Sequence, residues 1–306
     1  MKDTLDNNTA YRGRFAPSPT GPLHFGSLIA ATGSYLQARH QQGEWHLRIE
    51  DIDPPREIPG ATDSILKTLD AYGFEWDGEV IYQSQRLDIY QKYLNQLAKD
   101  HYTFPCTCSR KDINQLLTKS STPVYPGTCR NRTDVTGEQV AYRVIAQDEV
   151  VTFHDPLQGK QSVHLQTEIG DFVVKRADGL FSYQLAVAID DGSMGISEVV
   201  RGSDLLDSTP RQIYLQQLLG LKTPDYIHLP VATNAEGQKL SKQTYASALD
   251  TTNPVSVLWQ VLKILGQSPP HELGNTSLSE LWQWAIANWN MQTVPRTSSF
   301  IVNDIK

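Results

Sequence analysis

The stretch from residue 14 to residue 27 constrains the fold more than any other part of this chain. It reads Arg-Phe-Ala-Pro-Ser-Pro-Thr-Gly-Pro-Leu-His-Phe-Gly-Ser, and an amphipathic helical pattern follows it directly. Prolines fix the backbone of such a turn, and Gly21 and Gly26 let a ligand approach it closely. Free amides, a helix N-terminus and His24 could then meet an anion. The stretch predicts a strand, a phosphate-binding turn and a helix. The alternative is a proline-rich loop whose histidine only caps the helix.

Strand and helix patterns alternate through much of the chain. Apolar residues alternate with polar ones at 45–49, and helical spacing recurs at 61–72 and 87–97. Ser182 can cap a further helix, 196–200 is strand-like, and a helix beginning near Pro210 would stop at Gly220. We therefore expect an α/β fold with a doubly wound parallel sheet. Ligands of such folds bind at the carboxyl ends of the strands.

Two charged residues lie at predicted strand ends. Glu50 follows the strand at 45–49, and Arg201 follows the strand at 196–200. A carboxylate in this place is often only a turn cap. The arginine could simply pair with Asp204, although its planar fork also suits a substrate carboxylate. Both residues are candidates for a binding site.

The segment from Tyr102 to Arg132 interrupts the alternation and carries all three cysteines of the chain. An odd number of cysteines argues against a disulfide framework. Cys106, Cys108 and Cys129 could chelate one tetrahedral zinc ion, and three sulfurs leave one position open. The candidates for that position are His101, Asp112 and Tyr125. Three structural thiols without a metal are the alternative.

The same segment is locally basic, although the chain has a net charge of -7. Between residues 106 and 132 only Asp112 opposes five basic residues, which are Arg110, Lys111, Lys119, Arg130 and Arg132. An acidic protein does not bind nucleic acid indiscriminately, so a polynucleotide would have to bind such a patch. A solvated surface is the plainer interpretation. The pattern from 139 to 174 is mostly β.

A second lysine-rich loop and a helical region complete the chain. Lys239-Leu-Ser-Lys-Gln243 could neutralise triphosphate charge as it develops during a reaction. Helices are expected at 254–265 and 278–289, the second with a Ser277–Glu280 capping box. Four of the six tryptophans lie beyond Tyr245, and their helical spacing favours core packing over base stacking. The polar start of the chain and the absence of any membrane-length apolar run predict a cytoplasmic protein.

Two motifs in this order resemble the class I aminoacyl-tRNA synthetases of the glutamyl and glutaminyl branch. The run from Pro17 to Gly26 is similar to their first signature, with Ser27 in place of a histidine, and Lys239–Gln243 is similar to their second. The resemblance implies His24 and Lys242 as catalytic residues. It implies ATP contacts from Pro17, Gly21, His24, Gly26, Lys239 and Lys242. It implies glutamate contacts from Arg14, Ala16, Ser18, Glu50, Tyr183 and Arg201.

The resemblance also implies cofactors and an architecture. It favours Tyr125 as the fourth ligand of a structural zinc ion beside Cys106, Cys108 and Cys129, and Mg²⁺ would accompany ATP. Arg14 and Arg201 would serve a substrate with two carboxylates, which favours glutamate over glutamine. We expect a first half of the nucleotide-binding domain at 1–100, a zinc-containing insertion that contacts tRNA at 101–179, the second half at 180–245, and a short helical region at 246–306.

The shortness of the region after the second motif narrows the resemblance to the glutamyl-Q tRNA(Asp) synthetase family. This implies activation of L-glutamate with ATP and transfer to queuosine in the anticodon of tRNA(Asp). Three alternatives stay open: a truncated glutamyl-tRNA synthetase that charges a tRNA 3′ end, a nucleotidyltransferase that activates another acid, and a non-catalytic tRNA-binding paralogue.

Overall fold

A computed structural model describes residues 10–117, 124–132, 134–135, 139–234 and 248–301. Five parallel strands form its centre: β1 (Arg12–Phe15), β2 (Glu44–Ile49), β3 (Ile81–Tyr82), β9 (Glu198–Gly202) and β10 (Asp225–Leu229). β9 lies beside β1, and the Ser197 amide donates to the Arg12 carbonyl at 2.9 Å. The spatial order is therefore β3, β2, β1, β9, β10, as in a Rossmann-like sheet.

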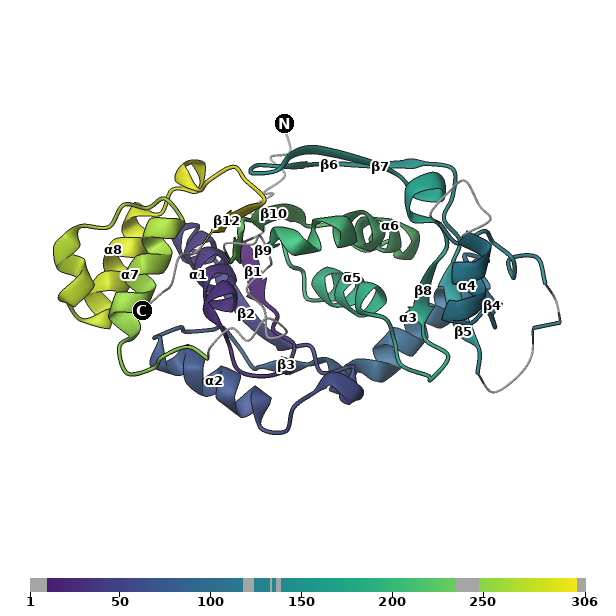
Figure 1. Cartoon of the computed structure of the whole chain (residues 1–306), viewed down its shortest axis with the longest axis horizontal. Helices are drawn as coiled ribbons and strands as arrows, with labels where there is room; N and C mark the ends of the chain where they lie inside the picture. The colour runs from purple at the N-terminus through teal and green to yellow at the C-terminus, as the bar shows by residue number, and fades with distance from the viewer. Residues whose placement is uncertain (1–9, 118–123, 133, 136–138, 235–247, 302–306) are drawn as a thin grey trace, which may run out of the picture.

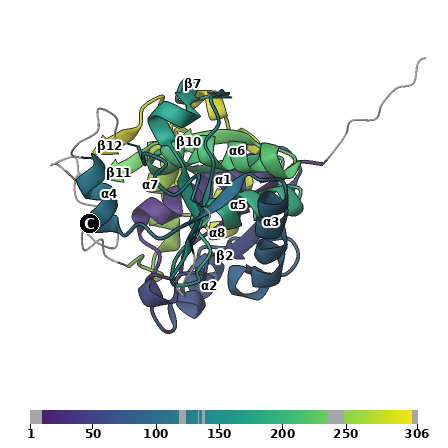
Figure 2. The same cartoon turned by 90° about the vertical axis from the view of Figure 1, so that its right-hand side faces the viewer.

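Helices cover both faces of this sheet (Figure 1). α1 (Phe25–His40) lies on one face, and α5 (Tyr183–Ser193) and α6 (Thr209–Leu219) lie on the other. α3 (Leu87–Lys99) packs with α5 and α6 (Figure 2), and α2 (Ala61–Ala71) connects β2 to β3. Successive strand side chains enter opposite cores: Val200 joins the α1 core, and Val199 joins the α5 core. The predicted α/β core is confirmed.

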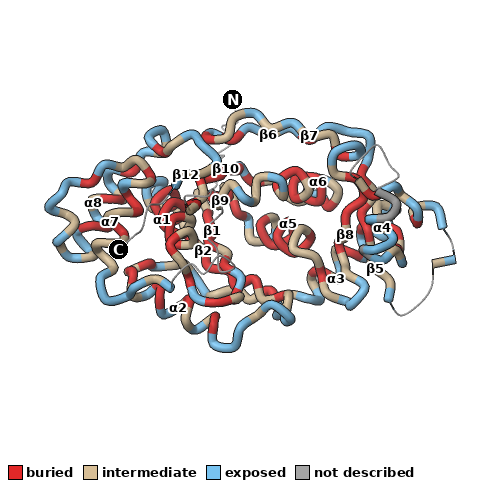
Figure 3. Tube along the Cα trace, viewed as in Figure 1, coloured by how far each residue is buried: buried red, intermediate tan, exposed pale blue. Residues whose placement is uncertain are grey.

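Local capping explains where several of these helices begin and end. Ser182 accepts from the Leu185 amide at 3.3 Å and starts α5, as predicted. α6 ends before Gly220, which has a left-handed φ of 64°. α1 ends at His40, which is earlier than the expected Gly43. The buried residues are concentrated in α1, α5, α6 and the strands between them (Figure 3).

The segment 101–179 contains antiparallel β-structure, and its part at 139–174 is mostly β, as predicted. It consists of β4 (Thr103–Cys106), α4 (Arg110–Leu117), β5 (Ala141–Val144), β6 (Val150–Asp155), β7 (Gly159–His164), a helical turn at Leu165–Ile169, and β8 (Phe172–Lys175). β5 pairs with β4 and β8. β6 and β7 form a hairpin that runs along one edge of the molecule, from β10 to the end that carries α4 (Figure 1). This segment is therefore attached to the central sheet through its hairpin.

The last described region contains α7 (Pro254–Ile264) and α8 (Leu278–Asn288), which pack against α1. The Ser277–Glu280 capping box is confirmed. Trp282 and Trp289 are buried in the α1 core, which confirms packing as their role. The region is not purely helical, because β12 (Ser299–Ile301) pairs in parallel with β11 (Val231–Thr233). Sequence periodicity missed this strand because it has only three residues.

Short 3₁₀-helices connect the longer elements. They lie at Pro54–Arg56, Gln83–Arg86, Ser203–Ser208, His271–Asn275 and Met291–Thr293. Among the described residues, no helix combines the length and the apolarity that crossing a bilayer requires.

Candidate functional site

A cavity of about 620 Å³ lies at the carboxyl ends of the central strands. Nine of the predicted site residues line it: Arg14, Ala16, Pro17, Ser18, His24, Gly26, Glu50, Tyr183 and Arg201. Gly21 is not part of this lining, and its φ of 138° shows that the turn itself requires a glycine there. Lys239 and Lys242 lie outside the described residues. The structure therefore brings all six residues predicted for glutamate, and Pro17, His24 and Gly26 of those predicted for ATP, into one cavity.

Arg14 is held in a buried ion pair at the edge of this cavity. Its Nε and Nη2 each donate to the Asp191 carboxylate at 3.2 Å. Arg48 donates to the same carboxylate from Nη1 at 2.7 Å. Burial opposes ionisation of Asp191, but the two arginines outweigh it and lower its pKa to about 2. Asp191 therefore holds the edge of the Arg14 guanidinium that is formed by Nε and Nη2. Nη1 lies on the side of the guanidinium that does not contact Asp191.

A completely buried arginine connects this pair to Glu50. Arg48 Nη2 donates to Glu50 at 3.2 Å, and its Nε lies 3.7 Å from Asp190. Burial raises the pKa of Glu50 despite the nearby Arg48 and Arg14. The Glu50 amide donates to the Pro17 carbonyl at 3.0 Å, which ties the end of β2 to the proline-rich turn. A carboxylate so placed can attract a substrate cation.

Arg201 lines the cavity from β9. Its Nε donates to His228 Nε2 at 3.2 Å, and its Nη2 donates to the Thr209 hydroxyl at 2.7 Å. Its Nη1 is buried and has no hydrogen-bond partner among the described residues. A buried donor without a partner is costly, so an oxygen ligand would stabilise it. Tyr183 also lines the cavity, and burial followed by the Glu50 charge raises the pKa of its hydroxyl, which therefore stays protonated.

The helix α1 begins at the cavity, with His24 as its N-cap. His24 Nδ1 accepts from the Ser27 amide at 3.3 Å. In a neutral imidazole the proton then resides on Nε2. His24, Gly26 and Ser27 all line the cavity beside the helix N-terminus, where the dipole favours an anion. The sequence left helix capping and anion binding as alternative roles of His24. The structure allows both, because His24 caps α1 and also lines the cavity.

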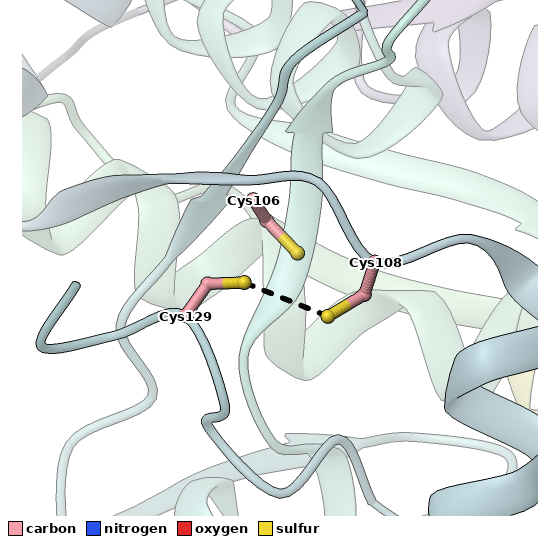
Figure 4. A group of neighbouring side chains, drawn as sticks. All are labelled: Cys106, Cys108 and Cys129. Carbon is pink, nitrogen blue, oxygen red and sulfur yellow. Dashed lines mark hydrogen bonds between the residues drawn. The ribbon is translucent and has the colours of Figure 1, made fainter. Parts of the chain in front are cut away.

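A separate cluster of donor atoms lies in the 101–179 segment. The sulfurs of Cys106, Cys108 and Cys129 converge (Figure 4), all within 4.8 Å of one another, and Cys108 and Cys129 are 3.5 Å apart. The Tyr125 hydroxyl lies 3.4 Å from Cys106 and 3.5 Å from Cys108. A tetrahedral zinc ion places sulfurs about 3.8 Å apart and sulfur and oxygen about 3.5 Å apart. Of the three candidates for the fourth position, Tyr125 thus has the distances that zinc requires.

Some of the basic residues near this cluster pair with acids that lie beyond residues 106–132, the range over which the charges were counted. Arg130 Nε donates to Asp171 at 3.0 Å, and Arg132 Nε donates to Asp134 at 2.9 Å. Lys119 lies outside the described residues. The local excess of positive charge is therefore smaller than the count within residues 106–132 indicates. That count does not include Asp134 and Asp171, which lie later in the chain.

Sequence reasoning missed the buried residues that support the cavity. Strand alternation placed Arg48 with polar residues, yet the residue is fully buried. Asp190 and Asp191 follow an apolar helical run in the sequence. Two acids next to such a run could have indicated buried carboxylates with basic partners. Asp155 and His228 gave no comparable signal because they come from distant segments. The remaining partners of Asp190 are Gln83, Arg86 and Tyr90.

Comparison with known proteins places this cavity in a defined class. Residues 10–269 match the family model of the class I tRNA synthetases (E and Q), catalytic domain. The chain belongs to this family. A glutamate-tRNA synthetase from Elizabethkingia anophelis has 27% identity and a TM-score of 0.79, over 95% of this chain and 68% of the other. A glutamate tRNA ligase from Elizabethkingia meningosepticum, solved in complex with its amino acid, has a TM-score of 0.78.

More similar relatives define the branch. The glutamyl-Q tRNA(Asp) synthetase of Dechloromonas aromatica is 51% identical over 96% of this chain and 99% of its own length. That of Chromobacterium violaceum is 52% identical over 94% of this chain and 97% of its own length. Within the class I family, the chain therefore belongs to the glutamyl-Q tRNA(Asp) synthetases.

Proposed function

We propose that this chain activates L-glutamate with ATP and transfers the glutamyl group to queuosine in the anticodon of tRNA(Asp). One structural observation carries the first half of this function: the cavity brings Arg14, Arg201 and Glu50 together at the carboxyl ends of the strands. A glutamate carries two carboxylates and one ammonium, which is the complementary set of charges. The near full-length similarity to glutamyl-Q tRNA(Asp) synthetases supports the acceptor.

We assign the glutamate contacts to Arg14, Ala16, Ser18, Glu50, Tyr183 and Arg201. The two arginines bind the carboxylates, and Glu50 binds the ammonium. The buried Nη1 of Arg201 supports this assignment, because a carboxylate oxygen would supply the partner that it lacks in the described structure. Burial raises the pKa of Glu50, and a bound ammonium would favour its ionised form.

We assign ATP to the turn that leads into α1. Pro17, Gly21, His24 and Gly26 form or line this turn, and Lys239 and Lys242 would approach from the second motif. A glutamate carboxylate oxygen attacks the α-phosphorus, the bond to the bridging oxygen breaks, and pyrophosphate leaves with that electron pair. His24 and Lys242 act by stabilising the phosphate charge that develops. Mg²⁺ enters with the triphosphate as its counter-ion.

The second step needs no covalent enzyme intermediate. A queuosine hydroxyl attacks the activated carbonyl, AMP leaves, and an ester forms. We assign contact with the tRNA to the insertion at 101–179. A zinc ion held by Cys106, Cys108, Tyr125 and Cys129 would have a structural role there, because all four positions are protein ligands. The domain boundaries predicted from the sequence remain part of this proposal.

ATP–pyrophosphate exchange tests the activation step. We expect exchange that depends on glutamate, without tRNA, and not on the other amino acids. Labelled glutamate should then transfer to tRNA(Asp) that contains queuosine and not to tRNA(Asp) that lacks it. Exchange without glutamate dependence would contradict the activation step. Equal transfer to both tRNAs, or charging of tRNA(Glu) at its 3′ end, would contradict the acceptor.

Elemental analysis tests the zinc site separately. The wild-type chain should contain about one zinc ion, and Cys106→Ser should lose it. Equal metal content in the two proteins would refute this site while leaving the exchange result untouched.

A further inference from the structure

The hairpin β6–β7 reaches from the cysteine-containing end of the molecule to β10 of the central sheet. Its turn begins at Asp155, whose carboxylate is completely buried. Oδ1 accepts from the amides of Leu157 and Gln158 at 2.8 and 2.9 Å. Oδ2 accepts from the backbone amide of His228 at 2.8 Å and from its ring Nδ1 at 2.7 Å. Both oxygens of this carboxylate are therefore used as acceptors.

These contacts determine which nitrogen of His228 carries the proton. Because Asp155 can only accept when it is ionised, Nδ1 of His228 must donate and therefore carries hydrogen. Nε2 of the neutral ring is then an acceptor. Arg201 Nε donates to it at 3.2 Å, and the Thr209 hydroxyl, which can also donate, lies 2.9 Å from it. Burial, together with the nearby Arg201 charge, lowers the pKa of His228 and keeps the ring neutral. The chain of contacts runs from Asp155 through His228 to Arg201.

The remaining contacts of Arg201 fix the rest of its guanidinium. Nη2 donates to Thr209, and the guanidinium lies over the Tyr226 ring, 5.4 Å from its centroid. With Nε and Nη2 occupied, Nη1 is the nitrogen that has no partner among the described residues. The orientation of this donor depends on the acceptor state of His228 Nε2, because a proton there would face the Nε–H of Arg201.

We propose that Asp155 and His228 are positioning residues for substrate carboxylate binding: they orient Arg201 so that its Nη1 is presented to one carboxylate of glutamate. This inference rests on the proposed function and deepens it. It also gives the hairpin a role in substrate binding, because β6, which lies outside the central sheet, ends at Asp155.

Asp155→Asn tests this arrangement with almost no change in shape. An asparagine that keeps its oxygen toward the Leu157 and Gln158 amides turns its NH₂ toward His228 Nδ1, and it also loses the acceptor for the backbone amide of His228. The ring must then take the other tautomer, with a proton on Nε2 opposite Arg201. We expect the KM for glutamate in pyrophosphate exchange to rise about tenfold to a hundredfold, with the KM for ATP unchanged. Equal changes in both constants, or none in either, would overturn the proposal.

The chain offers a matched control on the same hairpin region. Asp148 contacts His164 Nε2 at 3.1 Å, and its side chain is 78% exposed. Asp148→Asn removes an aspartate–histidine pair of the same chemistry far from the cavity. We expect both KM values to stay at the wild-type level, and a rise in the KM for glutamate as large as that of Asp155→Asn would refute a specific role for Asp155.

Two further measurements keep the proposal falsifiable if Asp155→Asn does not fold. His228→Gln can keep an acceptor near the Nε2 position, whereas His228→Asn cannot, so the KM for glutamate should rise less in the glutamine variant. The ¹⁵N spectrum of histidine-labelled wild type, assigned by loss of one signal in His228→Gln, should show the Nδ1–H tautomer. An Nε2–H tautomer, or the opposite order of the two KM values, would overturn it.

A double-mutant cycle separates positioning from a general structural effect. If Asp155 acts through Arg201, Asp155→Asn should add little to the rise in the KM for glutamate that Arg201→Lys already causes. Full additivity would refute action through Arg201. Failure of the proposed function is distinguishable, because wild type itself would then show no glutamate-dependent exchange.

Discussion

The cavity and the cysteine cluster are both built from buried polar side chains, but they are organised in different ways. Around the cavity, Arg14, Arg48 and Asp191 hold one another in ion pairs on the ends of strands and helices that have large apolar cores. At the cluster, the buried core consists of Phe104 and three of the four donor residues themselves, Cys106, Tyr125 and Cys129. The cavity is therefore preorganised without a ligand, whereas the cluster has only a small buried core around it.

The comparison has a physical cause. A large core fixes backbone positions, so charged side chains can be placed against one another at the edge of the sheet. A small core does not supply enough apolar burial, and small units commonly use metals for that reason. The two regions should therefore respond differently to substitution, and four predictions follow that difference from the largest effect to the smallest.

Removing Asp191 should damage the cavity most. Asp191→Asn leaves Arg14 and Arg48 short of a buried counter-charge, so the free energy of unfolding should fall by about 3–5 kcal/mol. Because the pKa of Asp191 is lowered from 3.8 to about 2, its stabilisation is complete above pH 3.8 and is lost as the pH falls toward 2. Urea denaturation at several pH values measures both effects. Asp134→Asn, in a pair with an exposed carboxylate, should leave the urea midpoint close to that of wild type.

Removing a cluster ligand should leave the cavity intact. Cys129→Ser should reduce bound zinc from about one ion per chain to near none and make the part of the insertion around the cysteines, residues 102–132, more sensitive to protease. Glutamate-dependent exchange should stay within about twofold of wild type, while transfer to tRNA falls. A parallel loss of exchange would mean that the two regions are not independent.

Neutralising Glu50 should separate binding from stability. Glu50→Gln removes the charge that we assign to the substrate ammonium, so the KM for glutamate should rise about tenfold to a hundredfold. Since burial raises the pKa of Glu50, its ionised form costs stability at neutral pH, and the variant should be as stable as wild type or more so. Exchange kinetics and thermal denaturation check this pair of outcomes. A marked loss of stability would assign Glu50 to the fold instead.

A substitution outside both regions should give the smallest effect. Ser277→Ala removes half of the α8 capping box and should cost about 1 kcal/mol of stability. Zinc content and the KM for glutamate should not change. Thermal denaturation measures the change in stability, and elemental analysis and exchange kinetics measure the zinc content and the KM for glutamate. A change in zinc content or in this KM would show that α8 is coupled to one of the two regions.

Features that depend on residues close together in the chain could be predicted from the sequence. Features that depend on pairs of residues far apart in the chain could not. Caps such as Ser182 and Ser277, the β-rich segment and the converging cysteines follow from neighbours in the chain. The burial of Arg48 does not, because its partners Asp190 and Asp191 come from a helix more than a hundred residues later. Arg201 shows the same limit: its nearest sequence partner was Asp204, yet its Nε contacts His228.

The parallel pairing of β11 with β12 has a consequence for synthesis on the ribosome. β11 carries Val231 and Ala232, which line the cavity, and its partner strand ends at Ile301. The Ser203 hydroxyl and the Gln158 amide also donate to carbonyls of residues 298 and 297. A nascent chain would therefore have synthesised all the other side chains that line the cavity before β12 could pair with β11 and complete this wall. Glutamate binding should be acquired late during translation, after the Rossmann-like core has already formed.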